Sequence, residues 1–397
     1  MKSDFLDPAL NPFNPGSGTR PPHLTGREAE VSAFETLIVR ASRKLPVRGM
    51  MFSGLRGVGK TVLLNRMRSI AQQNKWLTIS LEAHRSGRFA ESLGRHLYQV
   101  GRQLERGSHG KQAPASLRDA LSTIKSFNIG VGVSGITFNI ELDKTIRAQS
   151  GDIRTDLMEI IEDLSPFLIE QNTTLAIFID ELQDLDTTSL EALLTVQHRA
   201  NQEEWPFVLM GAGLPTLPSK LASCASYSER MFDTHVIGPL SDEDTYEALR
   251  TPIEDGGGSI SAGALGILAE ASGGYPYFIQ EFGSATWSNA SSSHISADDA
   301  KVAVLAAQAV LDSGFFPARW DRATKKEKDL LKAMSADGNG PSSLQSLVER
   351  MGKTKSSALS VTRKGLIDKG IVYSPAHGQL AFTVPGMADF IRRNTDG

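Results

Sequence analysis

Short apolar segments alternate with amphipathic segments between residues 26 and 240. The apolar segments read RGMMFSG, WLTISLEA, TLAIFID, PFVLMGAG and HVIGPL. Strands that are apolar almost throughout are typical of a sheet covered on both faces. Between them, apolar residues recur at helical spacing in the sets Leu63, Met67, Ile70 and Leu157, Ile160, Ile161, Leu164, Leu168. The alternation predicts an α/β domain over residues 25–240, built on an open parallel sheet.

One segment, residues 127–142, follows a period of two instead. Its apolar positions are Phe127, Ile129, Val131 and Val133 and, after Ser134 and Gly135, Ile136, Phe138 and Ile140. The pattern predicts a β-hairpin inserted into the α/β domain. Two roles stay open for its apolar face, which either covers a sheet edge or a neighbouring helix, or binds a partner.

The rest of the chain divides into an arm and two smaller domains. Prolines in residues 1–24 exclude regular helix and predict an extended arm. Residues 241–320 have a helical period with glycine breaks at residues 256–258 and 273–274, and predict a helical lid domain. Residues 321–397 contain three helical segments, TKKEKDLLKAM, PSSLQSLVERMG and KSSALSVTRKGLIDKG, and then the strands IVYSP and LAFTVP. This order predicts a winged helix.

Composition says more about the cellular compartment of the protein than about its function. The 397 residues carry a net charge of −3, with 40% hydrophobic and 22% charged residues, as in ordinary globular proteins. A single cysteine, Cys224, and the lack of zinc-type Cys/His spacing favour a reducing compartment. No apolar run approaches the ~18 residues of a membrane helix, and the N-terminus is proline-rich where a secretion signal would be apolar. We therefore expect a cytoplasmic protein without a membrane partner.

The strongest chemical signal is GLRGVGKT at residues 54–61, between an apolar strand and an amphipathic helix. The spacing G-x-x-x-x-G-K-[ST] is typical of a phosphate-binding loop. Its glycines let consecutive backbone N–H groups face an anion at a helix N-terminus. We expect Lys60 to meet the β- and γ-phosphates of ATP and Thr61 to hold Mg²⁺.

A second signal is TLAIFIDELQDL, an apolar strand that ends in Asp180 and Glu181. Ligands of open α/β sheets bind outside the carboxyl ends of the strands, so we expect Asp180 to complete the Mg²⁺ shell. We expect Glu181 to orient or deprotonate the attacking water. A glutamate directly after the metal ligand suits water activation better than phosphate transfer to a small molecule, which disfavours a kinase.

Five segments together resemble a family of bacterial and archaeal ATPases related to the origin-recognition initiators and to the signal-transduction (STAND) ATPases. They are LTGREAEV, the phosphate loop, IDELQDL, GAGLP and SGGYPYFIQEFG, over about residues 24–290, with a similar winged-helix tail. The resemblance implies an AAA+-like P-loop NTPase fold in which Arg27 and Glu28 line the adenine pocket. It also implies that Arg230, just before the fifth strand, completes the site of a neighbouring subunit, so that ATP binding favours a homo-oligomer.

Two departures from that family pattern imply slow turnover. The fourth strand ends in Met210, Gly211, Ala212 and Gly213, where the family often has a polar residue that senses the γ-phosphate. The lid has Gly273, Gly274, Tyr275 and Pro276 in place of the usual arginine, which resembles the glycine-proline variant of the switch-like branch. ATP held for long periods and hydrolysed as a timer would follow.

These signals define an expected site. The residues expected to hold the nucleotide are Arg27, Gly54, Leu55, Arg56, Gly57, Val58, Gly59, Lys60, Thr61, Val62, Asp180 and Pro276, and the catalytic residues are Glu181 and Arg230. Thr61 and Asp180 are the expected Mg²⁺ ligands. The predicted function is a nucleotide-dependent switch that binds ATP and hydrolyses it slowly.

The predicted winged helix is the basic part of the chain. Residues 321–397 contain 13 Lys/Arg and 8 Asp/Glu, a net charge of +5. Third helices of winged helices enter the major groove, and the residues placed to touch duplex DNA are Lys353, Lys355, Ser356, Ser357, Arg363 and Lys364. Two functions therefore stand: a DNA-associated ATPase, or a STAND-like signalling or defence regulator whose winged helix and hairpin bind proteins.

Overall fold

The computed structural model describes residues 5–16, 18–85, 87–107, 113–133, 135, 137–138 and 147–395. It divides into two compact units. The sheet unit comprises Arg27–Ser53 and Lys60–Val236. The helical unit comprises the residues up to Gly26, the segment Gly54–Gly59 and the chain from Ile237 onward.

The sheet unit is built on five parallel strands in the order β2-β3-β4-β1-β5. The strands are β1 Gly49–Ser53, β2 Leu77–Glu82, β3 Leu175–Asp180, β4 Phe207–Gly213 and β5 Phe232–Val236. Every residue of β1 and β4 is buried, as their continuous apolar character predicts. The predicted α/β class with an open parallel sheet is confirmed.

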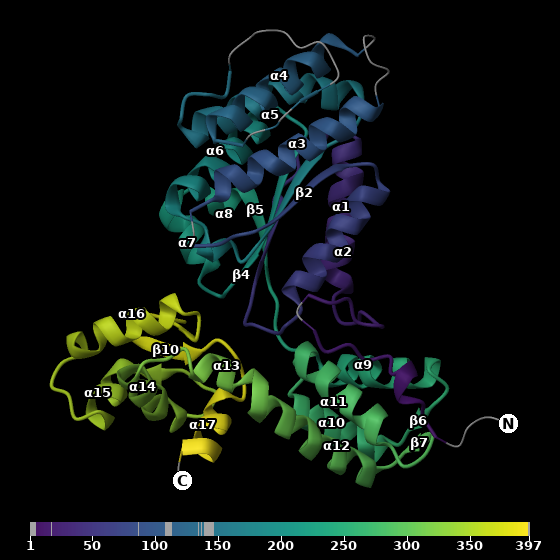
Figure 1. Ribbon diagram of the computed structural model, residues 1–397, viewed down its shortest axis with the longest axis vertical. Helices are drawn as coiled ribbons and strands as arrows, with labels where there is room; N and C mark the ends of the chain where they lie inside the picture. The colour runs from purple at the N-terminus through teal and green to yellow at the C-terminus, as the bar shows by residue number, and fades with distance from the viewer. Residues whose placement is uncertain are drawn as a thin grey trace. The chain divides into compact units, whose positions relative to one another are not determined.

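Helices cover both faces of this sheet (Figure 1). One face carries α1 Glu28–Ser42 and α2 Lys60–Gln73. The other carries α3 Phe89–Gly107, α4 Ala115–Gly130, α5 Ile153–Glu170 and α6 Thr187–Gln202, and the connection to β5 contains α7 Leu217–Cys224 and α8 Ser228–Met231. Phe34 of α1 meets Trp76 and Phe178 edge to face, with ring centroids 6.2 and 6.3 Å away. Such aromatic contacts join the first helical layer to the sheet.

The prediction for the fifth strand was shifted along the chain. β5 spans Phe232–Val236 and pairs with β1 from Gly49 to Ser53, whereas the sequence pattern placed the strand at residues 235–240. β5 lies at the edge of the sheet, and three of its five residues are exposed. An edge strand needs few apolar residues, so its apolar pattern is weak.

The predicted hairpin at residues 127–142 is wrong in its first strand. Residues 127–130 are the last turn of α4, and Phe127 continues the buried helical series Leu117, Leu121 and Ile124. Ile129, which the alternating pattern placed on the same face as Phe127, is 55% exposed. Two apolar residues two positions apart mimicked a strand where the helical period was the real one. The rest of the predicted hairpin lies largely outside the described residues.

Four long helices occupy most of the segment predicted as a helical lid domain, residues 241–320. They are α9 Asp242–Asp255, α10 Ala262–Ser272, α11 Pro276–Asn289 and α12 Ala297–Val310, with the two-residue parallel strands β6 Ser259–Ile260 and β7 His294–Ile295. The predicted arm is mostly free of regular structure, apart from the 3₁₀ helix η1 Pro8–Leu10. It is packed on the lid: Phe13 is 5% exposed, and the Trp287 indole donates to the Asp7 carbonyl at 2.8 Å.

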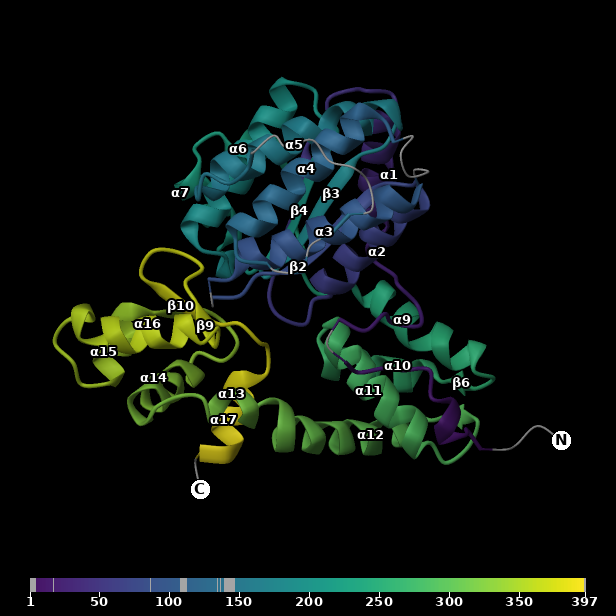
Figure 2. The same cartoon turned by 45° about the horizontal axis from the view of Figure 1, so that its top comes forward.

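The C-terminal part of the helical unit follows a π-helical turn, η4 Leu311–Phe315, and the short helix α13 Pro317–Trp320. Its elements are α14 Lys325–Ser335, β8 Ser342–Ser343, α15 Leu344–Arg350, η5 Ser356–Leu359, α16 Ser360–Asp368, β9 Val372–Tyr373, β10 Gln379–Phe382 and α17 Met387–Thr395. The strands form an antiparallel sheet in the order β8-β10-β9. Figure 2 shows α14, α15 and α16 beside β9 and β10. The predicted pairing of IVYSP with LAFTVP is confirmed, whereas β8 and α17 were not anticipated.

In the part of the chain that the structure describes, no helix combines the length and apolar character that crossing a bilayer requires.

Helix α2 ends in a cap formed by backbone hydrogen bonds. Lys75 has a φ of 63°, in the left-handed region. Its N–H donates to the Gln72 carbonyl, and the Trp76 N–H donates to the Ala71 carbonyl, both at 2.9 Å. These two bonds define a Schellman cap, a position at which glycine is preferred because a Cβ opposes positive φ.

Lys75→Gly is therefore expected to stabilise the protein by a few tenths to about 1 kcal/mol, because Lys75 is exposed and only its backbone conformation is changed. Thermal unfolding of the full chain measures the effect. Gln73→Gly, inside the last turn of α2, is the control and should lower stability by roughly 0.5–1 kcal/mol. Equal losses of stability in both variants would contradict the assigned cap.

Candidate nucleotide site

The phosphate loop connects the buried strand β1 to α2. Gly57 and Gly59 have φ values of 87° and 90°, which side chains with a Cβ rarely adopt. A Cβ on Gly54 would lie 2.1 Å from the Ile237 carbonyl oxygen, so this glycine permits a close backbone approach. The sequence thus supplies glycine where the loop conformation requires it, and the loop ends at the N-terminus of α2, where an anion is favoured.

Lys60 and Thr61 open α2, and Asp180 closes β3. The Lys60 side chain is 7% exposed. The Thr61 hydroxyl donates to Asp180 Oδ2 at 2.5 Å, and the Glu181 N–H donates to Asp180 Oδ1 at 2.8 Å. The structure therefore brings together the two predicted Mg²⁺ ligands across 119 positions of sequence. A hydroxyl and a carboxylate fit a hard cation that takes most of its other ligands from phosphates and water.

Glu181 sits in an unusual backbone conformation directly after Asp180. Its φ and ψ are 50° and 36°, in the left-handed region, and the 3₁₀ helix η3 Leu182–Asp184 follows. A non-glycine residue held there costs free energy and indicates that its surroundings fix it. Gln183 donates from Nε2 to Glu181 Oε2 at 2.5 Å. Sequence reasoning missed Gln183; its only signal was an amide two residues after the predicted base.

The loop segment Gly54–Gly59 also contacts the rest of the helical unit. The Tyr277 N–H donates to the Gly57 carbonyl at 3.2 Å, and the Arg56 N–H donates to the Thr383 carbonyl at 3.1 Å. The Pro276 ring lies 3.9 Å from where a Cβ on Gly59 would stand. Pro276, predicted from the family resemblance, is therefore placed beside the loop.

A second arginine near Arg56 was not anticipated from the sequence. The Arg319 guanidinium lies over the Phe315 ring, 4.0 Å from its centroid, and donates to the Phe315 carbonyl at 2.7 Å. Burial lowers the pKa of Arg319 to about 10, and the positive charge of Arg56 acts in the same direction. Arg319 still carries its charge at neutral pH.

The remaining predicted nucleotide residues lie at the start of α1, in the phosphate loop and in the first turn of α2. Arg27 is the half-exposed N-cap of α1, and the exposed Glu28 is its first residue. In the loop and α2, Leu55 and Val62 are half-buried, and Val58 is 1% exposed. These positions do not test the predicted contact of Arg27 and Glu28 with adenine, which stays a prediction.

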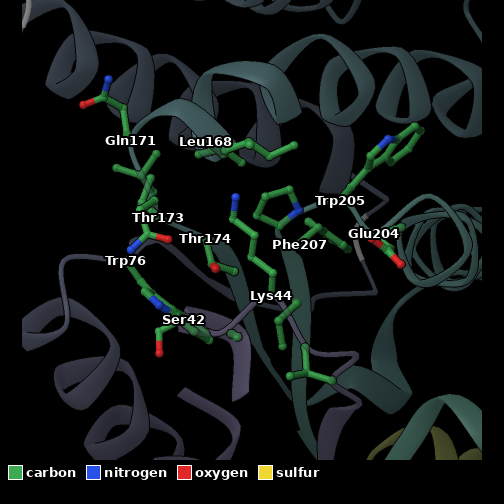
Figure 3. Close-up of a pocket in the computed structure, with 18 of the residues that line it drawn as sticks. Ser42, Lys44, Trp76, Leu168, Gln171, Thr173, Thr174, Glu204, Trp205 and Phe207 are labelled. Atoms are coloured by element: carbon green, nitrogen blue, oxygen red, sulfur yellow. The ribbon is translucent and has the colours of Figure 1, made fainter. Parts of the chain in front are cut away.

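Arg230 and Asp180 lie at opposite ends of the parallel strands. Phe232, the first residue of β5, pairs with Gly49, the first residue of β1, so Arg230 stands beyond the amino ends of the strands. There its exposed side chain lines a cavity of about 1440 Å³ with residues of segments 38–48, 74–77 and 200–208. Figure 3 shows Lys44, Trp76 and Trp205 in this cavity. Within one chain, Arg230 is not brought together with Thr61 and Asp180.

Two family models match the chain. Residues 23–210 match a family described as AAA ATPase domain, and residues 313–391 match a domain of unknown function (DUF8462). The match to the AAA ATPase domain agrees with the resemblance found in the sequence. No curated protein matches the chain.

Solved structures resemble the chain at low sequence identity. The Walker-type ATPase PABY2304 of Pyrococcus abyssi is 16% identical, with coverage of 96% of this chain and 99% of its own and a TM-score of 0.56. The ORC1 protein of Aeropyrum pernix in complex with DNA is 16% identical, with coverage of 99% and 98% and a TM-score of 0.47. The RuvB Holliday junction branch migration motor of Thermotoga maritima is 15% identical, with coverage of 90% and 92% and a TM-score of 0.44. The likeness to the first of these shows a shared fold.

Asp180→Asn is expected to remove most of the effect of Mg²⁺ on nucleotide affinity, roughly tenfold or more, because a neutral amide is a poor Mg²⁺ ligand. Titration of a fluorescent ATP analogue with and without Mg²⁺ measures it. Asp186→Asn is the matched control, since Asp186 caps α6 through the Ser189 N–H and asparagine caps equally well. If Mg²⁺ strengthened binding equally in both variants, Asp180 would not be a metal ligand.

Proposed function

We propose that the AAA ATPase domain binds ATP with Mg²⁺ at the phosphate loop and hydrolyses it slowly, so that the bound nucleotide acts as a switch. The observation that carries the proposal is the Thr61–Asp180 hydrogen bond at the carboxyl edge of the sheet, with Glu181 next in the chain. These three side chains supply a hydroxyl and a carboxylate for Mg²⁺ and a second carboxylate for the attacking water.

Each part of the site has a defined task in this proposal. The backbone N–H groups of residues 54–61 and the α2 N-terminus bind the phosphates, and Lys60 adds a cation at the β- and γ-phosphates. Thr61 and Asp180 would hold Mg²⁺, which supplies charge neutralisation at the phosphates. Glu181 accepts a proton from the attacking water and orients it. Binding is thus separated from the residue that carries out hydrolysis.

The proposed slow rate rests on two positions without a sensing side chain. β4 ends in Gly211, Ala212 and Gly213, and the lid begins α11 with Pro276 after Gly273 and Gly274. Charge that develops on the γ-phosphate then has fewer donors to stabilise it, and each missing donor costs a large factor in rate. ATP would remain bound long enough to act as a timed signal.

Arg230 is proposed to act on a second copy of the chain. It is exposed at the amino edge of the sheet, away from the Thr61–Asp180 pair of its own chain. An arginine supplied by a neighbour stabilises the transition-state charge, so hydrolysis would depend on assembly of a homo-oligomer in the cytoplasm.

We further propose that residues 321–397 form a winged helix that binds duplex DNA. The order α14-β8-α15-α16-β9-β10 with the sheet order β8-β10-β9 supports this assignment. Basic and hydroxyl side chains surround the start of α16: the exposed ones are Lys353, Lys355, Ser356, Ser357 and Lys364, and Arg363 is half-exposed. Such side chains bind phosphates and base edges.

One observation favours the second function, a STAND-like regulator with a protein partner. Val361, on the same face of α16 as Lys364, is 85% exposed. Such a side chain would be covered by a protein partner, or would meet a thymine methyl group of DNA. The salt dependence of binding distinguishes the two partners, because DNA binding releases counterions.

Mixing two inactive variants tests the site and the assembly together. Glu181→Gln and Arg230→Ala should each bind ATP but lose most turnover, since one lacks the base and the other the neighbour's cation. A mixture should recover part of the activity, because one interface then pairs an intact Glu181 with an intact Arg230. Phosphate release at several protein concentrations is the measurement. Normal turnover of Arg230→Ala at every concentration would remove the assembly claim.

DNA binding is tested on the full chain with ATP present. The proposal predicts duplex binding that weakens as salt rises, with a logarithmic slope of about −0.9 per phosphate contacted. Lys355→Ala and Lys364→Ala should each reduce the slope by about 1, whereas Lys301→Ala, on lid helix α12, should not. Fluorescence anisotropy of a labelled duplex provides the data. Absence of binding at low salt would favour the protein-binding regulator.

A further inference from the structure

We propose that Gln183 is a positioning residue for hydrolysis: it holds the Glu181 carboxylate in one orientation and ties it to the end of β4. The inference rests on the proposed role of Glu181. It assigns a task to a residue that the family pattern does not single out in this chain, and it explains why β4 ends in glycines.

The Gln183 amide bridges Glu181 to the end of β4 with both of its ends. Nε2 donates to Glu181 Oε2 at 2.5 Å, and Oε1 accepts from the Leu214 N–H at 2.8 Å. A backbone N–H can only donate and an ionised carboxylate can only accept, so this pairing defines the amide orientation. Neither an apolar side chain nor a second carboxylate could make both bonds.

The glycines of β4 provide the space for this bridge. A Cβ on Gly213 would lie 2.5 Å from Gln183 Oε1, and a Cβ on Gly211 would lie 2.7 Å from the Leu182 side chain. Any larger residue at these positions would push the η3 turn away from β4. The glycines at the end of β4 therefore leave room for the Gln183 amide between β4 and the η3 turn.

The turn that carries Gln183 is itself held in place. The Asp184 N–H donates to the Glu181 carbonyl at 2.7 Å, which closes the turn around the left-handed Glu181. Lys220 of α7 donates from Nζ to the Gln183 carbonyl at 2.8 Å and to the Leu185 carbonyl at 2.5 Å. Burial lowers the pKa of Lys220, as expected of an amine that is partly enclosed to make these bonds.

The chemical consequence concerns orientation. A carboxylate at the end of a glutamate side chain rotates freely unless a donor fixes it, and a general base must point at one proton. The Gln183 donor on Oε2 restricts the carboxylate plane, while the bond to Leu214 ties that orientation to β4. Gln183 acts through Glu181 and is not required for ATP binding.

The test replaces Gln183 by methionine, which has a similar volume and no amide. Single-turnover hydrolysis with protein in excess should slow about 10- to 100-fold, the loss expected for one hydrogen bond to a charged group, while ATP affinity stays within twofold. Gln197→Met is the matched control. Gln183 is half-buried, whereas Gln197 is fully buried; like Gln183, its side chain accepts from a backbone N–H, that of Leu209 of β4 at 2.7 Å, and it lies on α6 away from Glu181. It should lower stability but leave the rate unchanged.

The same substitution in the Glu181→Gln background separates positioning from general damage. If Gln183 works only through the Glu181 carboxylate, Gln183→Met should slow Glu181→Gln by less than twofold. The same loss in both backgrounds, or an unchanged rate in the wild-type background, would overturn the proposal. Gln183→Glu, which keeps the shape but removes the donor, replaces the methionine variant if that one does not fold. Failure of Glu181→Gln itself to slow hydrolysis would instead refute the proposed base, and the Gln183 proposal would fall with it.

Discussion

The hydrogen bond from the Thr61 hydroxyl to the Asp180 carboxylate joins the two halves of the proposed nucleotide site. Thr61 is positioned by the loop that leaves β1, and Asp180 by the end of β3. These two strands are separated in the sheet by β4 alone, so the parallel order β2-β3-β4-β1-β5 is what brings the hydroxyl and carboxylate to one edge. The apolar strands, covered by helices on both faces, hold the carboxyl ends of β1 and β3 in fixed relative positions.

The turn after Asp180 adds a second constraint of the same kind. Glu181 adopts a left-handed backbone conformation, and Gln183, Leu214 and Lys220 form the hydrogen bonds that hold the turn against β4 and α7. Backbone strain of this kind persists only where several contacts specify it, and such contacts are concentrated at functional sites. The proposed metal ligand Asp180 and the proposed base Glu181 therefore occupy neighbouring but separately supported positions.

The sequence predicted the parts of this arrangement that depend on local pattern. Apolar runs located β1 to β4, and the spacing of the phosphate-loop motif located Lys60 and Thr61. A buried strand and a loop of this kind each require particular residue types at neighbouring positions, so the sequence alone shows them. Phe127 and Ile129 led to a wrong strand prediction, because residues two apart in sequence lie on one face of a strand but on opposite faces of a helix. The predicted position of β5 was shifted because an edge strand has few apolar residues to mark it. Gln183 was missed because its meaning depends on Leu214, a tertiary neighbour. The role predicted for Arg230, in the site of a neighbouring subunit, stays a proposal because the structure holds a single chain.

Hydrolysis in water labelled with ¹⁸O tests the central claim most directly, namely that this site cleaves bound ATP by attack of a water held at Glu181. The chain is incubated with ATP, and the released phosphate is analysed by mass spectrometry. The account predicts one labelled oxygen in each phosphate and ADP as the other product, formed slowly compared with ATP binding. Bound ATP that stays intact throughout, or phosphate that carries no label, would contradict it.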